Sequence, residues 1–247
     1  MDNYNGLADE HYVNLNLTTE LDLPGTRDTL LHFFEQLRKR FPTMRNFYRR
    51  DRGDFVLEED KDGGSYRWAT VEQKRISSGY VNPPDTVLVT SQHEAVLESI
   101  PYSLSVSPLD CESLNYMLGF DFNFCGNQHE LLANALGIQP AFEPLTRLPG
   151  ARIVSSEPSI QLALEDDCRT QCRLNVETRT SAYQIRTGEY PTEQISVYLT
   201  LRRYGSLDSN ESFVSELRDL KARADELMQS YVIDNVLQPL QQAISIS

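Results

Sequence analysis

Apolar and polar residues alternate in two stretches of this chain that lie about a hundred residues apart. The first is residues 12–17 (YVNLNL), after which a Pro24-Gly25 turn leads into an apolar-rich helix expected at 27–41. The second is residues 120–124 (FDFNF), after which Gly126-Asn127 leads into a helix expected at 128–136. Strand-like segments follow each helix. The pattern predicts an α+β fold with two similar strand-helix-strands units, that is, an internal duplication.

The first predicted unit covers residues 11–110 and follows a loose, polar segment at 1–10. Its helix carries one apolar stripe at spacings typical of a buried face. Strands are expected at 11–21, 45–58, 65–77 and 103–107, with an acidic, glycine-rich hairpin turn at 59–64 and a short helix at 92–99.

The second predicted unit covers residues 111–247. After the helix at 128–136 comes an irregular, proline-containing stretch at 137–156, followed by strands at 159–166, 172–179, 181–187 and 194–204. In the last strand Ile195, Val197, Leu199 and Leu201 face one way and polar side chains face the other. Such alternation indicates an antiparallel sheet with one buried face. We expect each unit's sheet to be covered by a helix.

The longest predicted helix covers residues 210–238, with Asp208 and Glu211 at its start and Pro239 expected to kink or stop it. Its apolar residues follow a heptad-like spacing over nearly three heptads. Such a seam packs either on the chain's own sheet or on a second copy. The homodimer would use the residues Phe213, Leu217, Leu220, Leu227 and Tyr231.

Composition limits the classes of function. The chain has 247 residues with 40% hydrophobic and 24% charged residues, which is typical of globular proteins. Neither a signal peptide nor an apolar run of membrane-spanning length is evident, so the expected location is the cytoplasm, without membrane binding. The net charge of −13 disfavours duplex DNA as a partner.

The charge is unevenly distributed. Residues 38–52 hold seven basic residues and one acid, a local charge of +6, which leaves −19 for the rest. Guanidinium groups and aromatic rings alternate there, a combination that binds phosphate, nucleic-acid strands or acidic proteins. An acidic protein partner or a small anionic ligand fits the overall charge best. The candidate contacts are Arg45, Tyr48, Arg49, Arg50, Arg52 and Trp68. The alternative is a solvated hairpin with Trp68 in the core.

Four side chains have the chemistry of zinc ligands: Cys125, His129, Cys168 and Cys172. No resident cofactor other than this possible zinc is expected. The spacing of three intervening residues in both pairs is unlike that of zinc knuckles. Cys168 and Cys172 can equally face each other across a hairpin loop, and Cys125 can pack as a small apolar residue.

In its layout the chain resembles a sporadically distributed family of bacterial α+β proteins of about this length. The matching pieces are Val13–Leu21, the segment 38–43 (RKRFPT), Ile195–Tyr204 and Phe213–Leu240. The resemblance implies the architecture and brings no activity or site residues with it.

Three functions follow as hypotheses. The first is a non-enzymatic cytoplasmic module that binds a ligand or a protein through a sheet–helix groove or through the basic segment. The second is a metal-dependent or hydrolytic enzyme whose site is assembled in space. The third is a structural homodimer formed through helix 210–238.

Overall fold

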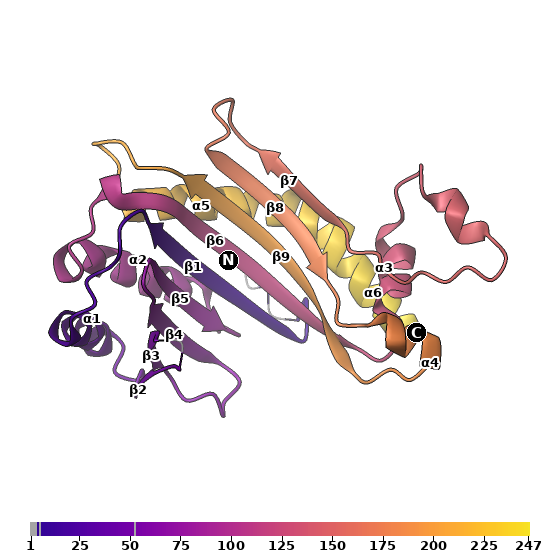
Figure 1. The fold of residues 1–247 in the computed structure, drawn as a ribbon, viewed down its shortest axis with the longest axis horizontal. Coiled ribbons are helices and arrows are strands. Elements are labelled where there is room, and N and C mark those ends of the chain that lie inside the picture. The colour runs from indigo at the N-terminus through magenta and orange to yellow at the C-terminus, as the bar shows by residue number, and fades with distance from the viewer. Residues whose placement is uncertain (1–3, 5, 52) are drawn as a thin grey trace.

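A computed structural model describes residues 4, 6–51 and 53–247. The described strands are β1 (Glu10–Thr19), β2 (Asn46–Arg49), β3 (Phe55–Glu58), β4 (Tyr66–Val71), β5 (Arg75–Val81), β6 (Cys111–Phe124), β7 (Ser159–Ala163), β8 (Thr170–Glu177) and β9 (Glu193–Tyr204). They form one antiparallel sheet in the order β2-β3-β4-β5-β1-β6-β9-β8-β7 (Figure 1). Both predicted units therefore contribute to a single continuous sheet, joined where β1 pairs with β6.

Alternation in the central strands gives this sheet two different faces. In β1 the odd-numbered side chains are buried and the even-numbered ones are partly exposed. Val13, Leu15 and Leu17 belong to the hydrophobic core together with Leu199 and Leu201 of β9. The prediction of an antiparallel sheet with one buried face is confirmed.

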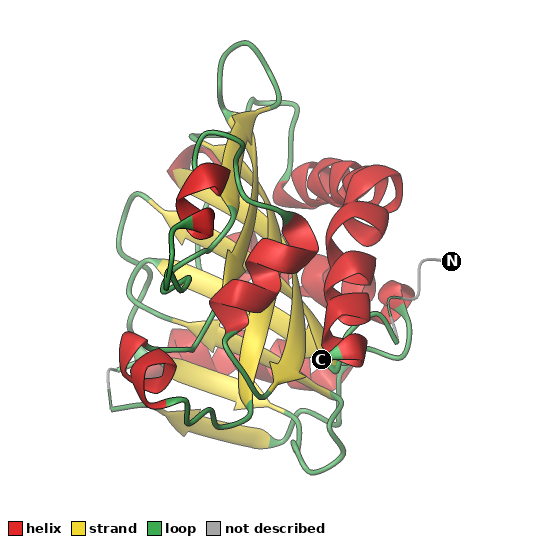
Figure 2. Ribbon diagram, turned by 90° about the vertical axis from the view of Figure 1, so that its right-hand side faces the viewer, coloured by secondary structure: helices red, strands yellow, loops and turns green. Residues whose placement is uncertain are grey.

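Helices cover the apolar face (Figure 2). They are α1 (Arg27–Arg40), α2 (Thr86–Ser103), α3 (Gln128–Leu136) and α5 (Phe213–Leu227), which runs through a π-helical segment (Met228–Leu237) into α6 (Gln238–Ile246). Helix α1 begins at the N-cap Thr26 and buries Leu30, Phe33, Phe34 and Leu37, as its stripe predicted. The α+β class is confirmed.

Several predicted elements are different in the structure. The stretch 45–58 is a hairpin, because Gly53 adopts a φ of +100° in the turn between β2 and β3. The predicted strand 181–187 is instead α4 (Ala182–Thr187), which a capping box of Ser181 and Gln184 begins and the left-handed Gly188 ends. Helix α2 is longer than predicted and ends at Ser103, so the residues at 103–107 form no strand.

The C-terminal helix also differs from its prediction. It begins at Phe213 with Ser212 as N-cap, while Glu211 bonds back to the backbone of Asp208. Pro239 does not stop it, and the backbone stays helical to Ile246. A proline has no N–H to donate, and here it stands in the first turn of α6, directly after the wider π-helical turns.

The seam of this helix packs on the chain's own sheet. Phe213, Leu217 and Leu220 are buried in the hydrophobic core, whereas Leu227 is partly buried and Tyr231 is 52% exposed. Three of the five residues predicted to form a homodimer are thus unavailable for a second copy in this fold. The seam reflects packing within the chain.

The start of the chain also packs against the C-terminal helix and the sheet. Tyr4, in the segment expected to be loose, is 3% exposed, and its hydroxyl donates to Asp225 Oδ1 at 3.1 Å. Its ring meets Phe120 edge to face.

Candidate binding face

The face of the sheet opposite the helices is polar, and no helix of the described residues crosses its centre (Figures 1 and 2). We call it the open face. Strand register aligns the residues of this face across neighbouring strands: Asn14 lies between Gly79 and Met117, and Met117 lies opposite Thr200. The face comprises, among others, Tyr12, Asn14, Asn16, Trp68, Thr70, Ser77, Gly79, Asn115, Met117, Gly119, Gln171, Arg173, Asn175, Tyr198, Thr200 and Arg202.

Two glycines let aromatic rings lie flat on the open face. A Cβ atom on Gly79 would come within 2.3 Å of the Trp68 indole, and one on Gly119 within 2.3 Å of the Tyr12 ring. Trp68 is therefore a partly buried residue of this face and does not belong to the helix-covered core. Since glycine weakens a strand, its presence opposite these rings indicates that the close approach matters to the sheet.

The open face is hollowed in each half. The N-terminal depression, about 360 Å³, is lined by Asn16, Arg50, Glu58, Lys61, Tyr66, Trp68, Thr70, Glu72, Arg75 and Ser77. The C-terminal depression, about 400 Å³, is lined by Met117, Gln161, Gln171, Arg173, Asn175, Glu177, Tyr198, Thr200 and Arg202.

The two depressions differ in how their charges are balanced. In the N-terminal one, Lys61 pairs with Glu58 at 3.1 Å and Arg75 pairs with Glu72 at 2.7 Å. In the C-terminal one, neither Arg173 nor Arg202 has a carboxylate within 4.0 Å among the described residues. Our sequence reasoning missed both arginines, although the alternation of the last strand already placed Arg202 on its polar side.

The predicted basic residues do not form one patch. Alternation in β2 separates Tyr48, whose hydroxyl donates to Glu58, from Arg49, whose guanidinium lies 5.4 Å above the Phe55 ring. Arg45 is exposed and donates to the backbone oxygen of Pro42, while Arg50 lines the N-terminal depression. Arg52 lies outside the described residues.

The four predicted zinc ligands are not brought together. Cys125 follows β6 where that strand pairs with the start of β9, whereas Cys168 lies in the β7–β8 turn near the end of β9. Cys172 is buried, and all four cysteines of the chain are free thiols. No group of three or more His, Cys, Asp or Glu side chains in the described ranges is arranged to hold a metal ion.

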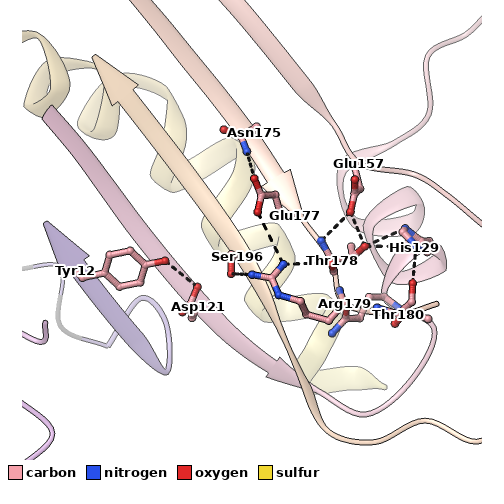
Figure 3. A network of polar contacts seen from close by, with 11 residues as sticks. Tyr12, Asp121, His129, Glu157, Asn175, Glu177, Thr178, Arg179, Thr180 and Ser196 are labelled. Carbon is pink, nitrogen blue, oxygen red and sulfur yellow. Dashed lines mark hydrogen bonds and ion pairs between the residues drawn. The ribbon is translucent and has the colours of Figure 1, made fainter. Parts of the chain in front are cut away.

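His129 instead belongs to a polar network beside the open face (Figure 3). Its Nδ1 accepts from the Ser156 N–H at 3.1 Å, and its Nε2 lies 3.1 Å from the Thr180 carbonyl oxygen. Glu157 accepts from both the N–H and the hydroxyl of Thr178. Burial alone would raise the pKa of Glu157, but these hydrogen bonds lower it below its usual value.

Gln128, the neighbour of His129 in α3, binds the backbone of the segment 179–180. Its side-chain oxygen accepts from the N–H groups of Arg179 and Thr180, and its Nε2 donates to the Glu193 carbonyl. These bonds tie α3 to the segments around β8 and β9. The network therefore fixes backbone segments in place, and His129 has a structural role in it.

On the open face, Asp121 lies beside Tyr12 and opposite Ser196 (Figure 3). The Tyr12 hydroxyl donates to Asp121 Oδ1 at 3.4 Å, and Arg179 donates to Ser196 on the strand opposite. Burial raises the pKa of the Asp121 carboxyl, and its hydrogen bonds from Ser196 and Tyr12 offset part of that rise. Burial likewise raises the pKa of the Tyr12 hydroxyl.

Comparison with known proteins adds no assignment to this geometry. None of the helices in the described part of the chain is both long and apolar enough to cross a bilayer. A scan against protein-family models gives no match, and neither does a search of curated proteins.

Proposed function

We propose that this protein is a non-enzymatic binding module that takes its ligand or partner on the open face. One observation carries the proposal: a nine-stranded sheet leaves a polar, hollowed face uncovered, while helices cover the other face. Amide, hydroxyl and guanidinium groups on that face offer hydrogen bonds to a ligand, and the flat aromatic rings of Tyr12 and Trp68 offer contact area.

A second argument concerns the origin of the face. We infer that residues 11–110 and 111–247 are two diverged copies of one unit. In each, the first strand pairs with the last and a helix follows. The N-caps Thr26 and Asn127 are 101 residues apart, which is also the separation between the paired residues Leu15 and Tyr116. For an offset of 101 residues, a two-fold axis relating the units would pass through the Leu15–Tyr116 pair.

On this view the two depressions are counterparts that have diverged. Both lie on the two strands next to a first strand, one on β4 and β5 and the other on β8 and β9. Lys61 and Arg75 are paired with carboxylates in the first, whereas Arg173 and Arg202 of the second have no such partner among the described residues. A duplicated surface with one altered copy suits a binding role, in which one half recognises a feature that the other does not.

The proposal can be tested with reporters that the chain already contains. Met117 lines the C-terminal depression, and the single tryptophan, Trp68, lines the N-terminal one. Met44 and Met228 are buried in the helix-covered core, at 1% and 0% exposed, and serve as internal controls. The protein labelled with ¹³C at its methionine methyl groups is mixed with small-molecule and macromolecular fractions of an extract from its source cells.

We expect a saturable shift of the Met117 methyl signal or of Trp68 emission while Met44 and Met228 stay unchanged. Met117→Leu identifies the methyl signal. A response confined to the two core methionines, or no response to either fraction, would contradict binding at the open face.

A further inference from the structure

The C-terminal depression places two positive charges side by side on a strongly acidic protein. Arg173 lies opposite Thr200 and Arg202 lies opposite Gln171, so the two arginines are diagonal neighbours across β8 and β9. Long side chains in that relation are within reach of one another, and their like charges repel. With a net charge of −13, carboxylates are plentiful elsewhere in the chain.

The surrounding side chains do not neutralise this pair. Of the nine lining residues, Glu177 is the one with a carboxyl group, and it accepts from Asn175 and lies 3.9 Å from Arg179. The rest of the lining near the arginines consists of amides and hydroxyls, such as Gln161, Gln171 and Thr200. These groups hydrogen-bond an anion without adding negative charge.

Arg202 is held in place before any ligand arrives. Its Nε donates to Asn115 Oδ1 at 2.6 Å, its Nη1 donates to the Tyr204 hydroxyl at 2.7 Å, and its guanidinium lies 5.3 Å from the Tyr204 ring centroid. No hydrogen-bond partner for its Nη2 occurs in the part of the chain that the structure describes. A guanidinium fixed by neutral neighbours loses little conformational entropy when it binds an oxyanion.

We propose that the C-terminal depression binds a small molecule through a carboxylate or phosphate group held between Arg173 and Arg202. This proposal rests on the proposed function and gives it a ligand class. The volume of about 400 Å³ is in the range of small-molecule sites. Both groups present the oxygen pair that a guanidinium fork binds with two parallel hydrogen bonds. Arg202 anchors the group, and the exposed Arg173 closes on it.

The experiment is a titration of the methionine-labelled protein with pyrophosphate and, separately, with glutarate, at low ionic strength. We expect at least one of the two to shift the Met117 methyl signal saturably and to bind more weakly as salt is added. A response to pyrophosphate alone assigns a phosphate ligand, and a response to glutarate alone assigns a carboxylate ligand. Arg173→Gln and Arg202→Gln should each weaken binding roughly tenfold or more, since a charge-assisted hydrogen bond is lost.

Arg38→Gln is the matched control, because it removes the same charge from an exposed position in α1, outside the open face. Its affinity should equal that of the wild type. Arg173→Gln should melt at the same temperature as the wild type or higher, since it relieves the repulsion between the arginines. A lower melting temperature would instead assign Arg173 to the stability of the sheet.

Two results would overturn the anion site: no saturable Met117 shift with either probe, or a shift that survives the double substitution of both arginines. In either case the cell-extract experiment tests the proposed function separately. If the cell extract shifts Met117 while both probes fail, the open face binds a ligand that is not recognised as an anion. If the extract fails too, the binding role itself is refuted.

Discussion

His93 gives the sharpest prediction, because it is a titratable group sealed inside the core. Its side chain is fully buried in α2, where Nδ1 lies 3.1 Å from Ser78 Oγ and the ring meets Tyr116 edge to face. Gln92 Nε2 already donates to the same Ser78 oxygen, which leaves the hydroxyl proton for Nδ1. The neutral ring is therefore the form that this site accepts, and burial lowers the pKa of His93 to about 3.

The sign and size of the effect follow by linkage. In the unfolded chain the His93 imidazole titrates near its ordinary pKa of 6.5, so below that pH the unfolded state binds a proton that the folded state excludes. Stability is thus lost as pH falls below 6.5. Since one pKa unit corresponds to about 1.4 kcal/mol, His93 should cost about 2 kcal/mol between pH 7 and pH 5, and about 3 kcal/mol by pH 4.

The assay is urea unfolding of the wild type, of His93→Gln and of the exposed control His32→Gln at pH 7, 6, 5 and 4. Buried carboxyls such as Asp121 and Glu216, whose pKa values burial raises, act in the opposite direction. They are common to all three proteins and cancel in the difference. The wild type should lose about 2 kcal/mol relative to His93→Gln between pH 7 and pH 5, while His32→Gln follows the wild type. Parallel curves for the wild type and His93→Gln would refute the reasoning.

Three further predictions concern packing and exposure. Gly79→Ala should destabilise the protein by about 1–3 kcal/mol in urea unfolding, because the new methyl meets the Trp68 ring, while Gly63→Ala, with open space around it, should be nearly neutral. Gln128→Ala should cost roughly 2 kcal/mol or more and raise hydrogen exchange at the N–H groups of 179 and 180, which would lose their acceptor; unchanged exchange would contradict that role. Iodoacetamide should add two groups to the native protein by mass, and four after unfolding. The native sites should be the exposed Cys125 and Cys168, since burial shields Cys111 and Cys172 and raises their pKa values.

Local chemistry explains where sequence reasoning succeeded. The apolar stripe of α1 and the basic residues in its last turn agree with the helix that forms. The alternation of β9 placed Leu199 in the core and Thr200 on the polar face, as the structure has them. In both cases the period of the pattern is that of the element, and burial on one side makes the period visible.

The failures have an equally local cause. Residues 181–187 contain enough β-favouring side chains to resemble a strand, but the capping box at Ser181 and the glycine at 188 decide for a helix. The basic segment contains β2, in which neighbouring side chains point to opposite faces, so Tyr48 and Arg49 lie on different sides of the sheet. The sequence alone left open whether the basic residues share one face.

The sequence by itself determined the α+β class, the two-faced sheet and the seam of the C-terminal helix. Each of these follows from a periodic pattern of apolar residues that are close together along the chain. Tertiary structure alone decided that β1 pairs with β6, which fuses the halves into one sheet. It alone brought Arg173 beside Arg202 and moved Cys125 away from Cys168, since strand register, and not sequence spacing, sets which side chains meet across a sheet. The candidate site depends on that register, which is why it emerged from the fold.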